Sequence, residues 1–356
     1  MDDFEKAIIY SFDQSGGVND QLKAQALSYC EQAKHSPNII QACLEKLRVS
    51  QYAEVQFWCL QTLEEILKAR YVLMDVAERS FLQNAILGIM ASYGHDVDTS
   101  LEPRPIFVKN KLAQIIVILI CFDYPSGWPS VFLNLLSFAM KGPGEVEMFC
   151  RVLNTLDEEV ISLDYPRKPD EIATATRIKD AMRSQCVSQI VGTCYNLMMA
   201  YKGSRPHLAG MVLQTLQRCV AWIDINLVAN DTFIPIIFEF VTSPQESTEL
   251  RGAALDCLLA IVSKRMEASL KLSLLGQLQI GRICGPNMEK QGTELALKSS
   301  ALLTCFANEV LECHKKLPGG SSTGGTSAEE LLDAVLPSIF YYLQYGEEEI
   351  SSTTFQ

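Results

Sequence analysis

The chain has 356 residues, is 48% hydrophobic and carries a formal net charge of −12. Its apolar content is typical of a well-packed globular protein, and its length suits two ordinary domains or one solenoid. The acidic balance argues against a general nucleic-acid binder, because phosphate contacts need clustered lysine and arginine. Any such contact would need local basic patches, whereas the acidity itself suits a basic protein partner or a solvated surface.

Apolar residues recur with helical spacing along the chain, and strand alternation is nearly absent. Ser36-Pro37 gives a helix cap followed by proline at the first helical position. The pattern predicts helices over residues 2–12, 20–34, 37–48, 51–70, 75–93, 106–122, 129–141, 145–162, 170–202, 206–222, 229–242, 246–264, 268–282, 290–315 and 328–344.

Taken in pairs, these helices begin at intervals of about 40–50 residues, the range of HEAT-type repeats. The units are not strongly similar in sequence, so the prediction rests on helix pairing, and a single compact helical domain is the alternative. Short connections favour stacking. We therefore expect an all-α solenoid of HEAT-type, armadillo-like repeats.

The predicted organisation has four parts. Residues 1–164 and 165–317 form successive groups of repeats, and 318–327 is a flexible insert rich in Gly, Ser and Thr. Residues 328–356 begin a further, incomplete repeat, because the end from Glu347 trails off without a capping helix. A solenoid needs a polar cap to stay soluble, so we expect the chain to be the first part of something longer.

Cysteine usage predicts a reducing compartment. None of the twelve cysteines forms a C-x-x-C pair, and most lie in apolar helical runs. Reduced, buried thiols behave this way, whereas disulfide scaffolds and zinc ribbons space their cysteines differently. The cytosol or nucleus is the expected location.

No membrane segment is expected. The start Met-Asp-Asp-Phe-Glu lacks the basic and apolar regions of a signal peptide. The longest apolar run, 115–122, is far too short to span a bilayer.

The sequence offers no catalytic constellation. Its four histidines are scattered and show no zinc spacing, and no Gly-rich phosphate loop occurs. We therefore predict no catalytic residue, metal ligand, cofactor or small-molecule substrate, which leaves binding as the chemistry of the chain.

The first candidate binding surface opens the helix at 106–122. Its polar face consists of Lys109, Asn110, Lys111 and Gln114. The helix dipole does not favour lysine near an N-terminus, so two lysines there suggest a carboxylate or phosphate on a partner. A merely solvated face is the alternative.

Further candidates are glutamines and basic residues. Gln56 and Gln61 are expected to face away from the apolar side of their helix. The basic patches contain Arg167, Lys168, Arg177, Lys179, Arg183, Lys264 and Arg265. These residues are candidates for binding phosphate, although acidic neighbours dilute the patches. The alternative is that the charges serve only solubility or the helix dipole.

Several segments together resemble one family. They are MDDFEKAI at 1–8, VQFWCLQTL at 55–63, FVKNKLAQ at 107–114, YPSGWPSVF at 124–132, MFCRVLNTLDEEVISLDYPR at 148–167, IKDAMRSQC at 178–186 and WIDINLVANDTFIP at 222–235. These segments resemble the exportin-T family, which are the importin-β-type nuclear export receptors for tRNA. The resemblance is strongest to the plant form. The resemblance runs through nearly the whole chain.

This resemblance implies a right-handed superhelix of HEAT repeats that binds Ran-GTP through inner helices and tRNA in its cradle. Each ligand would favour binding of the other, and GTP hydrolysis in the cytoplasm would release the cargo. It implies passage through the nuclear pore, with contacts to pore proteins, and shuttling between nucleus and cytoplasm. Family members continue well past residue 356.

The resemblance also assigns the candidate residues. It gives the Ran-facing role to Lys109, Asn110, Lys111 and Gln114, and less directly to Gln56 and Gln61. We expect the basic patches from Arg167 to Arg265 to touch tRNA phosphates rather than bases, because RNA helices are read mainly through shape and backbone. The alternatives are an importin-β-type receptor for protein cargo and a HEAT scaffold subunit without a GTPase partner.

Overall fold

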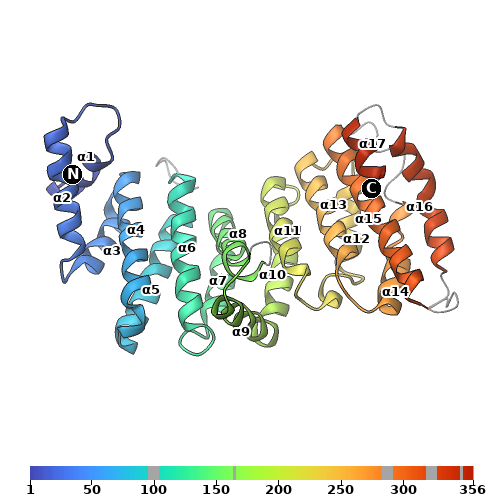
Figure 1. Cartoon of the computed structure of the whole chain (residues 1–356), viewed down its shortest axis with the longest axis horizontal. Helices are drawn as coiled ribbons and strands as arrows, with labels where there is room; N and C mark the ends of the chain where they lie inside the picture. Colours follow the sequence, from blue (N-terminus) through green and yellow to red (C-terminus); the bar gives the residue numbers. More distant parts are fainter. Residues whose placement is uncertain (95–103, 163–165, 283–291, 318–326, 345–347, 356) are drawn as a thin grey trace. The chain divides into compact units, whose positions relative to one another are not determined.

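The computed structural model describes residues 1–94, 104–162, 166–282, 292–317, 327–344 and 348–355, and every regular element in these ranges is helical (Figure 1). By packing, the chain divides into unit 1, Met1–Met182, and unit 2, Arg183–Gln356. The α-helices are α1 (Asp3–Phe12), α2 (Asp20–Lys34), α3 (Ile39–Val49), α4 (Ala53–Arg70), α5 (Val76–Gly94), α6 (Ile106–Asp123), α7 (Val131–Ala139), α8 (Pro143–Leu156), α9 (Pro169–Gln185), α10 (Val187–Tyr201), α11 (Pro206–Val220), α12 (Phe233–Thr242), α13 (Thr248–Ser263), α14 (Ala268–Leu278), α15 (Thr293–Lys316), α16 (Ala328–Leu343) and α17 (Glu348–Phe355). Short helical segments are η1 (Tyr71–Leu73), η3 (Asp157–Ile161), η4 (Ile225–Leu227) and η5 (Ile280–Arg282).

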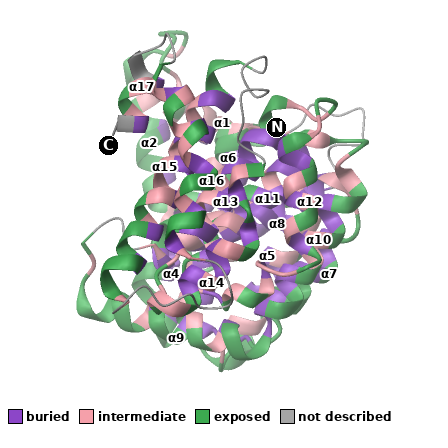
Figure 2. Ribbon diagram, turned by 90° about the vertical axis from the view of Figure 1, so that its right-hand side faces the viewer, coloured by how far each residue is buried: buried purple, intermediate pink, exposed green. Residues whose placement is uncertain are grey.

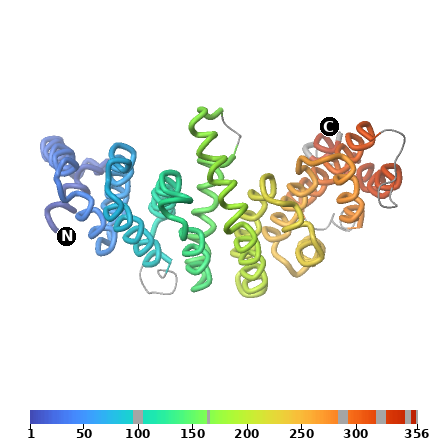
Figure 3. Tube along the Cα trace, turned by 90° about the horizontal axis from the view of Figure 1, so that it is seen from below, coloured from blue at the N-terminus to red at the C-terminus, as the bar shows by residue number. Residues whose placement is uncertain are grey.

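Unit 1 is a stack of helix pairs. The second helices of successive pairs, α4, α6 and α8, form one row in which each packs on the next. Helix α3 packs on α4 and α5, and α7 packs on α8. The Cα trace passes through these pairs one after another along the chain (Figure 3).

Unit 2 repeats this arrangement. Helices α11, α13 and α15 form a row, with α10 packed on α11, α12 on α13, and α14 on α15. Helices α16 and α17 both pack on α15. Both units therefore show the repeated pairing that the sequence predicts.

Two predicted boundaries are wrong. The helix expected over 170–202 is two helices, because Cys186 leaves helical geometry with φ −144° and ψ −12°. The sequence pattern also predicts no helix after Glu347, but α17 lies there and packs on α15 and α16. The predicted insert at 318–326 lies outside the described residues.

Burial explains the apolar run in α6. Ile115, Ile116, Leu119 and Ile120 are each 0% exposed, because α6 is covered by neighbouring helices on several sides. Buried residues also occur along many of the other helices, interspersed with exposed ones (Figure 2). Eight of the eleven cysteines in the described ranges are buried. No helix among the described residues is long and apolar enough to cross a membrane.

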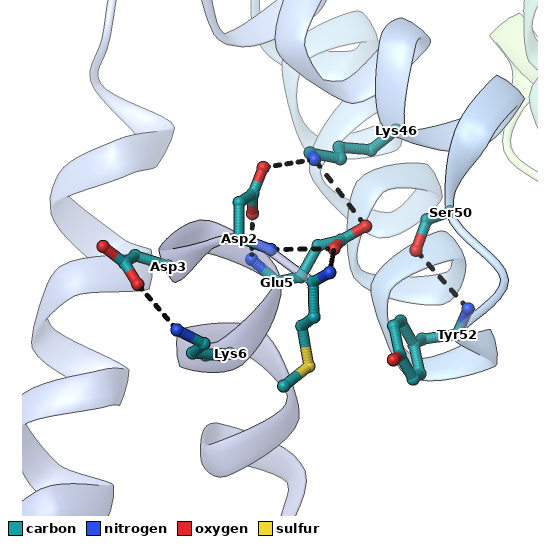
Figure 4. Close-up of polar contacts among 8 residues, drawn as sticks. Asp2, Asp3, Glu5, Lys6, Lys46, Ser50 and Tyr52 are labelled. Atoms are coloured by element: carbon teal, nitrogen blue, oxygen red, sulfur yellow. Dashed lines mark hydrogen bonds and ion pairs between the residues drawn. The ribbon is translucent and has the colours of Figure 1, made fainter.

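The first helix is fixed by a capping box and by an ion pair to α3 (Figure 4). The Asp2 carboxylate accepts from the Glu5 backbone N–H at 2.9 Å, and the Asp2 N–H donates to the Glu5 carboxylate at 3.2 Å. Lys46 Nζ lies 2.5 Å from Asp2 Oδ2 and 3.6 Å from Glu5 Oε1. This corner satisfies donors at the start of α1 and ties it to the second repeat helix pair.

Candidate functional site

The polar face at the start of α6 meets acidic residues of the neighbouring helices. Lys109 Nζ lies 3.0 Å from Glu147 Oε2 on α8. Lys111 forms an ion pair with Glu64 on α4. The three helices of the row are thus joined through the residues that the sequence singles out.

Further contacts extend this network toward η3. Arg151 on α8 pairs with Glu147 at 2.6 Å and donates to the side-chain oxygen of Asn110. Gln114 Nε2 donates to Glu159 Oε1 at 2.8 Å. The polar ladder is the set of these residues, Glu64, Lys109, Asn110, Lys111, Gln114, Glu147, Arg151 and Glu159.

The polar ladder is more enclosed than the sequence suggests. We expected a polar face open to a partner or to solvent, but Lys109 is 5% exposed because α8 lies against it. The side chains of Lys111 and Glu64 are 15% and 17% exposed. Asn110 is exposed and Gln114 half-buried, so these two are the more accessible predicted residues of α6.

Glu64 and Glu147 of the polar ladder are ionised at neutral pH. Burial raises the pKa of Glu64, but the ion pairs with Lys111 and Lys68 outweigh burial and hold that pKa below its usual value. For Glu147, burial likewise opposes the ion pairs with Lys109 and Arg151, and the net pKa is again lowered. Each acid therefore opposes its lysine as a full charge.

The two predicted glutamines of α4 have different surroundings. Gln56 is 2% exposed, and its Nε2 donates to the Ser50 carbonyl at 2.6 Å. The Gln56 side chain therefore forms part of the protein interior, and its burial argues against contact with a partner. Gln61 is exposed on α4, between Phe57 and Glu64.

A row of aromatic rings lies beside the ladder. Phe57 contacts Phe12 of α1 edge-to-face at 6.4 Å and Phe107 of α6 at 5.7 Å. Phe12 is 37% and Phe107 49% exposed. Phe107 was not among the residues predicted from the sequence, although helical spacing from Phe107 to Lys111 and Gln114 puts these three residues on one face of α6.

Two predicted basic residues of unit 1 cap helix ends. Arg167 donates from Nε to the Ser162 carbonyl at 2.9 Å, and its other nitrogens reach the carbonyls of Glu158 and Glu159. Arg177 donates to the carbonyl of Tyr124, and to that of Cys121 at 2.6 Å. These contacts satisfy carbonyls that have no partner within their own helix.

Unit 2 uses the same device at the end of α11. Lys264 Nζ donates to the carbonyls of Val220 at 2.7 Å and Ile223 at 2.9 Å. Arg183 donates to the Trp222 carbonyl at 2.8 Å and lies over the indole ring. Burial first, and then Arg183, lower the pKa of Lys264.

Other predicted basic residues point to solvent. Lys168 and Arg265 are exposed, and Lys179 is half-buried. The basic patches that the sequence groups together therefore split into helix caps and accessible charges.

Comparison with known proteins identifies the class. A crystal structure of importin beta matches with a TM-score of 0.55 at 12% identity, covering 99% of this chain and 45% of that chain. This likeness confirms the predicted all-α, HEAT-type fold. Residues 105–258 match the family model described as Exportin 1-like protein. The fold is therefore of the importin-β type, and residues 105–258 are similar to exportins.

Sequence comparison with related proteins then identifies the family within this class. The chain is 47% identical to exportin-T of Arabidopsis thaliana and 37% identical to exportin-T of Oryza sativa subsp. japonica, over 98% of its length in both cases. Identity to exportin-T of Homo sapiens is 27% over 94% of the chain. The chain spans 35% of the length of each of these relatives. It belongs to the exportin-T family.

Proposed function

We propose that this chain is part of a nuclear export receptor for tRNA that binds its cargo together with Ran-GTP. The similarity to exportin-T over 98% of the chain carries the proposal. The receptor shuttles between nucleus and cytoplasm, contacts pore proteins on the way, and releases its cargo when GTP is hydrolysed.

The row of α4, α6 and α8 supports a protein partner in unit 1. Partly exposed aromatic rings lie beside a polar ladder, and interfaces commonly combine an aromatic centre with a polar rim. Asn110, Gln114 and Gln61 are the accessible polar residues of this surface. We assign the GTPase to this surface, with Lys109 and Lys111 behind it.

A binding assay with the full-length protein that contains this chain tests the proposal. Ran-GTP should be retained, retention should rise when tRNA is added, and Ran-GDP should not be retained. Retention of Ran-GTP without a tRNA effect would favour a receptor for protein cargo. Absence of retention would favour a scaffold subunit and contradict the proposal.

The accessible basic residues are the proposed tRNA contacts. Replacing Lys168 and Arg265 with glutamine should weaken binding similarly for different tRNAs and flatten its salt dependence, because fewer counterions are released. Arg48→Gln, an exposed arginine on α3, is the matched control. An unchanged salt slope in the double variant would remove these residues from the tRNA site. Arg177 and Arg183 are unsuitable for this test because their loss also uncaps helices.

A further inference from the structure

The two lysines that lie behind the proposed GTPase surface already hold carboxylates of their own chain. Lys111 is paired with Glu64 on α4, and Lys109 with Glu147 on α8 at 3.0 Å. Each pair links different helices of the row, and each is largely shielded from water, which leaves less solvent to screen it. A partner that offers an acidic residue to either lysine meets a charge that is already compensated.

The acids also repel such a partner directly. Glu64 accepts from Lys68 at 2.7 Å as well as from Lys111, and Glu147 is shared between Lys109 and Arg151. Bringing a further carboxylate to Lys111 would place it near Glu64, and like charges at close range cost free energy. Competition for the lysine and repulsion by the acid therefore both weaken the binding of an acidic partner.

We propose that Glu64 and Glu147 are internal competitors that occupy Lys111 and Lys109 in the unbound receptor and that acidic residues of the partner GTPase displace. The inference rests on the proposed function, because it concerns the same surface. Binding then exchanges ion pairs within the row for ion pairs to the partner. The two glutamates thereby set how tightly the surface holds its partner without contributing attraction of their own.

Charge removal at the competitor tests this directly. In the full-length receptor with tRNA present, Glu64→Gln should bind Ran-GTP at least about threefold more tightly than the parent, and Glu147→Gln should shift affinity in the same direction. Glu45→Gln is the matched control, because it removes the same charge from an exposed position on α3. Glu45→Gln should leave the affinity near that of the parent. Circular dichroism and urea unfolding establish that each variant is folded.

A double-mutant cycle separates competition from a general charge effect. Lys111→Gln alone should weaken binding, and adding Glu64→Gln to it should bring a smaller gain than in the parent, because the lysine that the acid held is absent and only the repulsion is removed. A gain that is as large without Lys111 as with it, or an equal gain from Glu45→Gln, would overturn the proposal. So would a Glu64→Gln variant that binds no more tightly than the parent.

The assay also distinguishes failure of the inference from failure of the proposed function. If the parent binds Ran-GTP and the glutamate variants match it, Glu64 and Glu147 are not competitors while the receptor function stands. If the parent retains no Ran-GTP with or without tRNA, the receptor function fails, and the competition falls with it.

Discussion

The hydroxyl of Tyr71 donates a hydrogen bond to the carboxylate of Asp123, which lies 52 positions later in the chain. Gln83 Nε2 donates to the same oxygen at 2.7 Å, and Arg79 lies 3.5 Å from the other oxygen. Asp123 is the last residue of α6, where the helix dipole disfavours a negative charge. These donors therefore make a buried carboxylate tolerable and tie α5 and η1 to the end of α6.

Tyr71→Phe should lower the free energy of unfolding by about 1–3 kcal/mol, because Asp123 then loses a buried donor. Burial and the hydrogen bond to Asp123 raise the pKa of Tyr71 well above its usual range, so the hydroxyl remains a donor throughout the working pH range. Urea unfolding measures the loss. Tyr52→Phe is the control, since Tyr52 is 41% exposed. Equal effects of the two substitutions would contradict the role of the hydrogen bond.

Glu147 should contribute an acid-sensitive part of the stability. Burial opposes the ion pairs with Lys109 and Arg151, and the net pKa lies below the ordinary 4.5. A lowered folded-state pKa stabilises the fold above the unfolded-state pKa, and this contribution disappears as pH falls through the folded-state pKa.

Glu147→Gln should therefore be less stable than the parent at neutral pH, and the two should converge below pH 4.5. Urea unfolding at several pH values between these limits measures the difference. Glu45→Gln controls for the loss of an exposed carboxylate. If the difference in free energy of unfolding between Glu147→Gln and the parent stays constant across the pH series, the ion pairs are not its source.

Arg177 should matter for stability through the end of α6. Arg177→Met removes the donors to the carbonyls of Tyr124 and Cys121 and should lower the free energy of unfolding by about 1 kcal/mol. Lys179→Met, two positions along the same helix, is the matched control for lost charge. If both variants unfold at the same urea concentration, the cap contributes nothing measurable.

Thiol reactivity should follow burial. Burial raises the pKa of Cys257 to about 12 and that of Cys121 to about 11, so both thiols are protonated at neutral pH. In the native protein, iodoacetamide should leave Cys257 unmodified and, among the cysteines of the described ranges, react first at half-buried ones such as Cys305. After denaturation without reductant, mass spectrometry should find all twelve cysteines alkylated. A shortfall would reveal disulfides and overturn the expected reducing compartment.

Much of the fold could be predicted from the sequence because each repeat follows local rules. Capping residues and apolar spacing place helices such as α2 and α4 close to their observed bounds. The break at Cys186 could not be predicted in this way, since no glycine or proline marks it. Helix α17 was missed for a similar reason: its short, polar sequence is helical where it packs on α15 and α16.

The candidate site was predictable as a face but not in its pairings. The helical spacing of Lys111 and Gln114 defines one side of α6, and this side is the one that meets α4 and η3. The burial of Lys109 depends on where α8 lies, and its partner Glu147 is 38 positions away. The basic residues show the same limit, because a carbonyl at a distant helix end leaves no mark in the sequence around Arg177.

Several cations that cap helix ends come from later in the chain than the helices they serve. Arg177 closes α6, Lys264 closes α11, and Arg251 closes α12 through the Val241 carbonyl at 3.0 Å. Arg183 is the exception, because it reaches the end of α11 from the earlier helix α9. Opening one of these later helices therefore exposes the end of an earlier one, and among these four caps only the opening of α9 works the other way. In a stack where each repeat touches its neighbours, this asymmetry gives fraying a direction, from the C-terminal side of each unit toward its start.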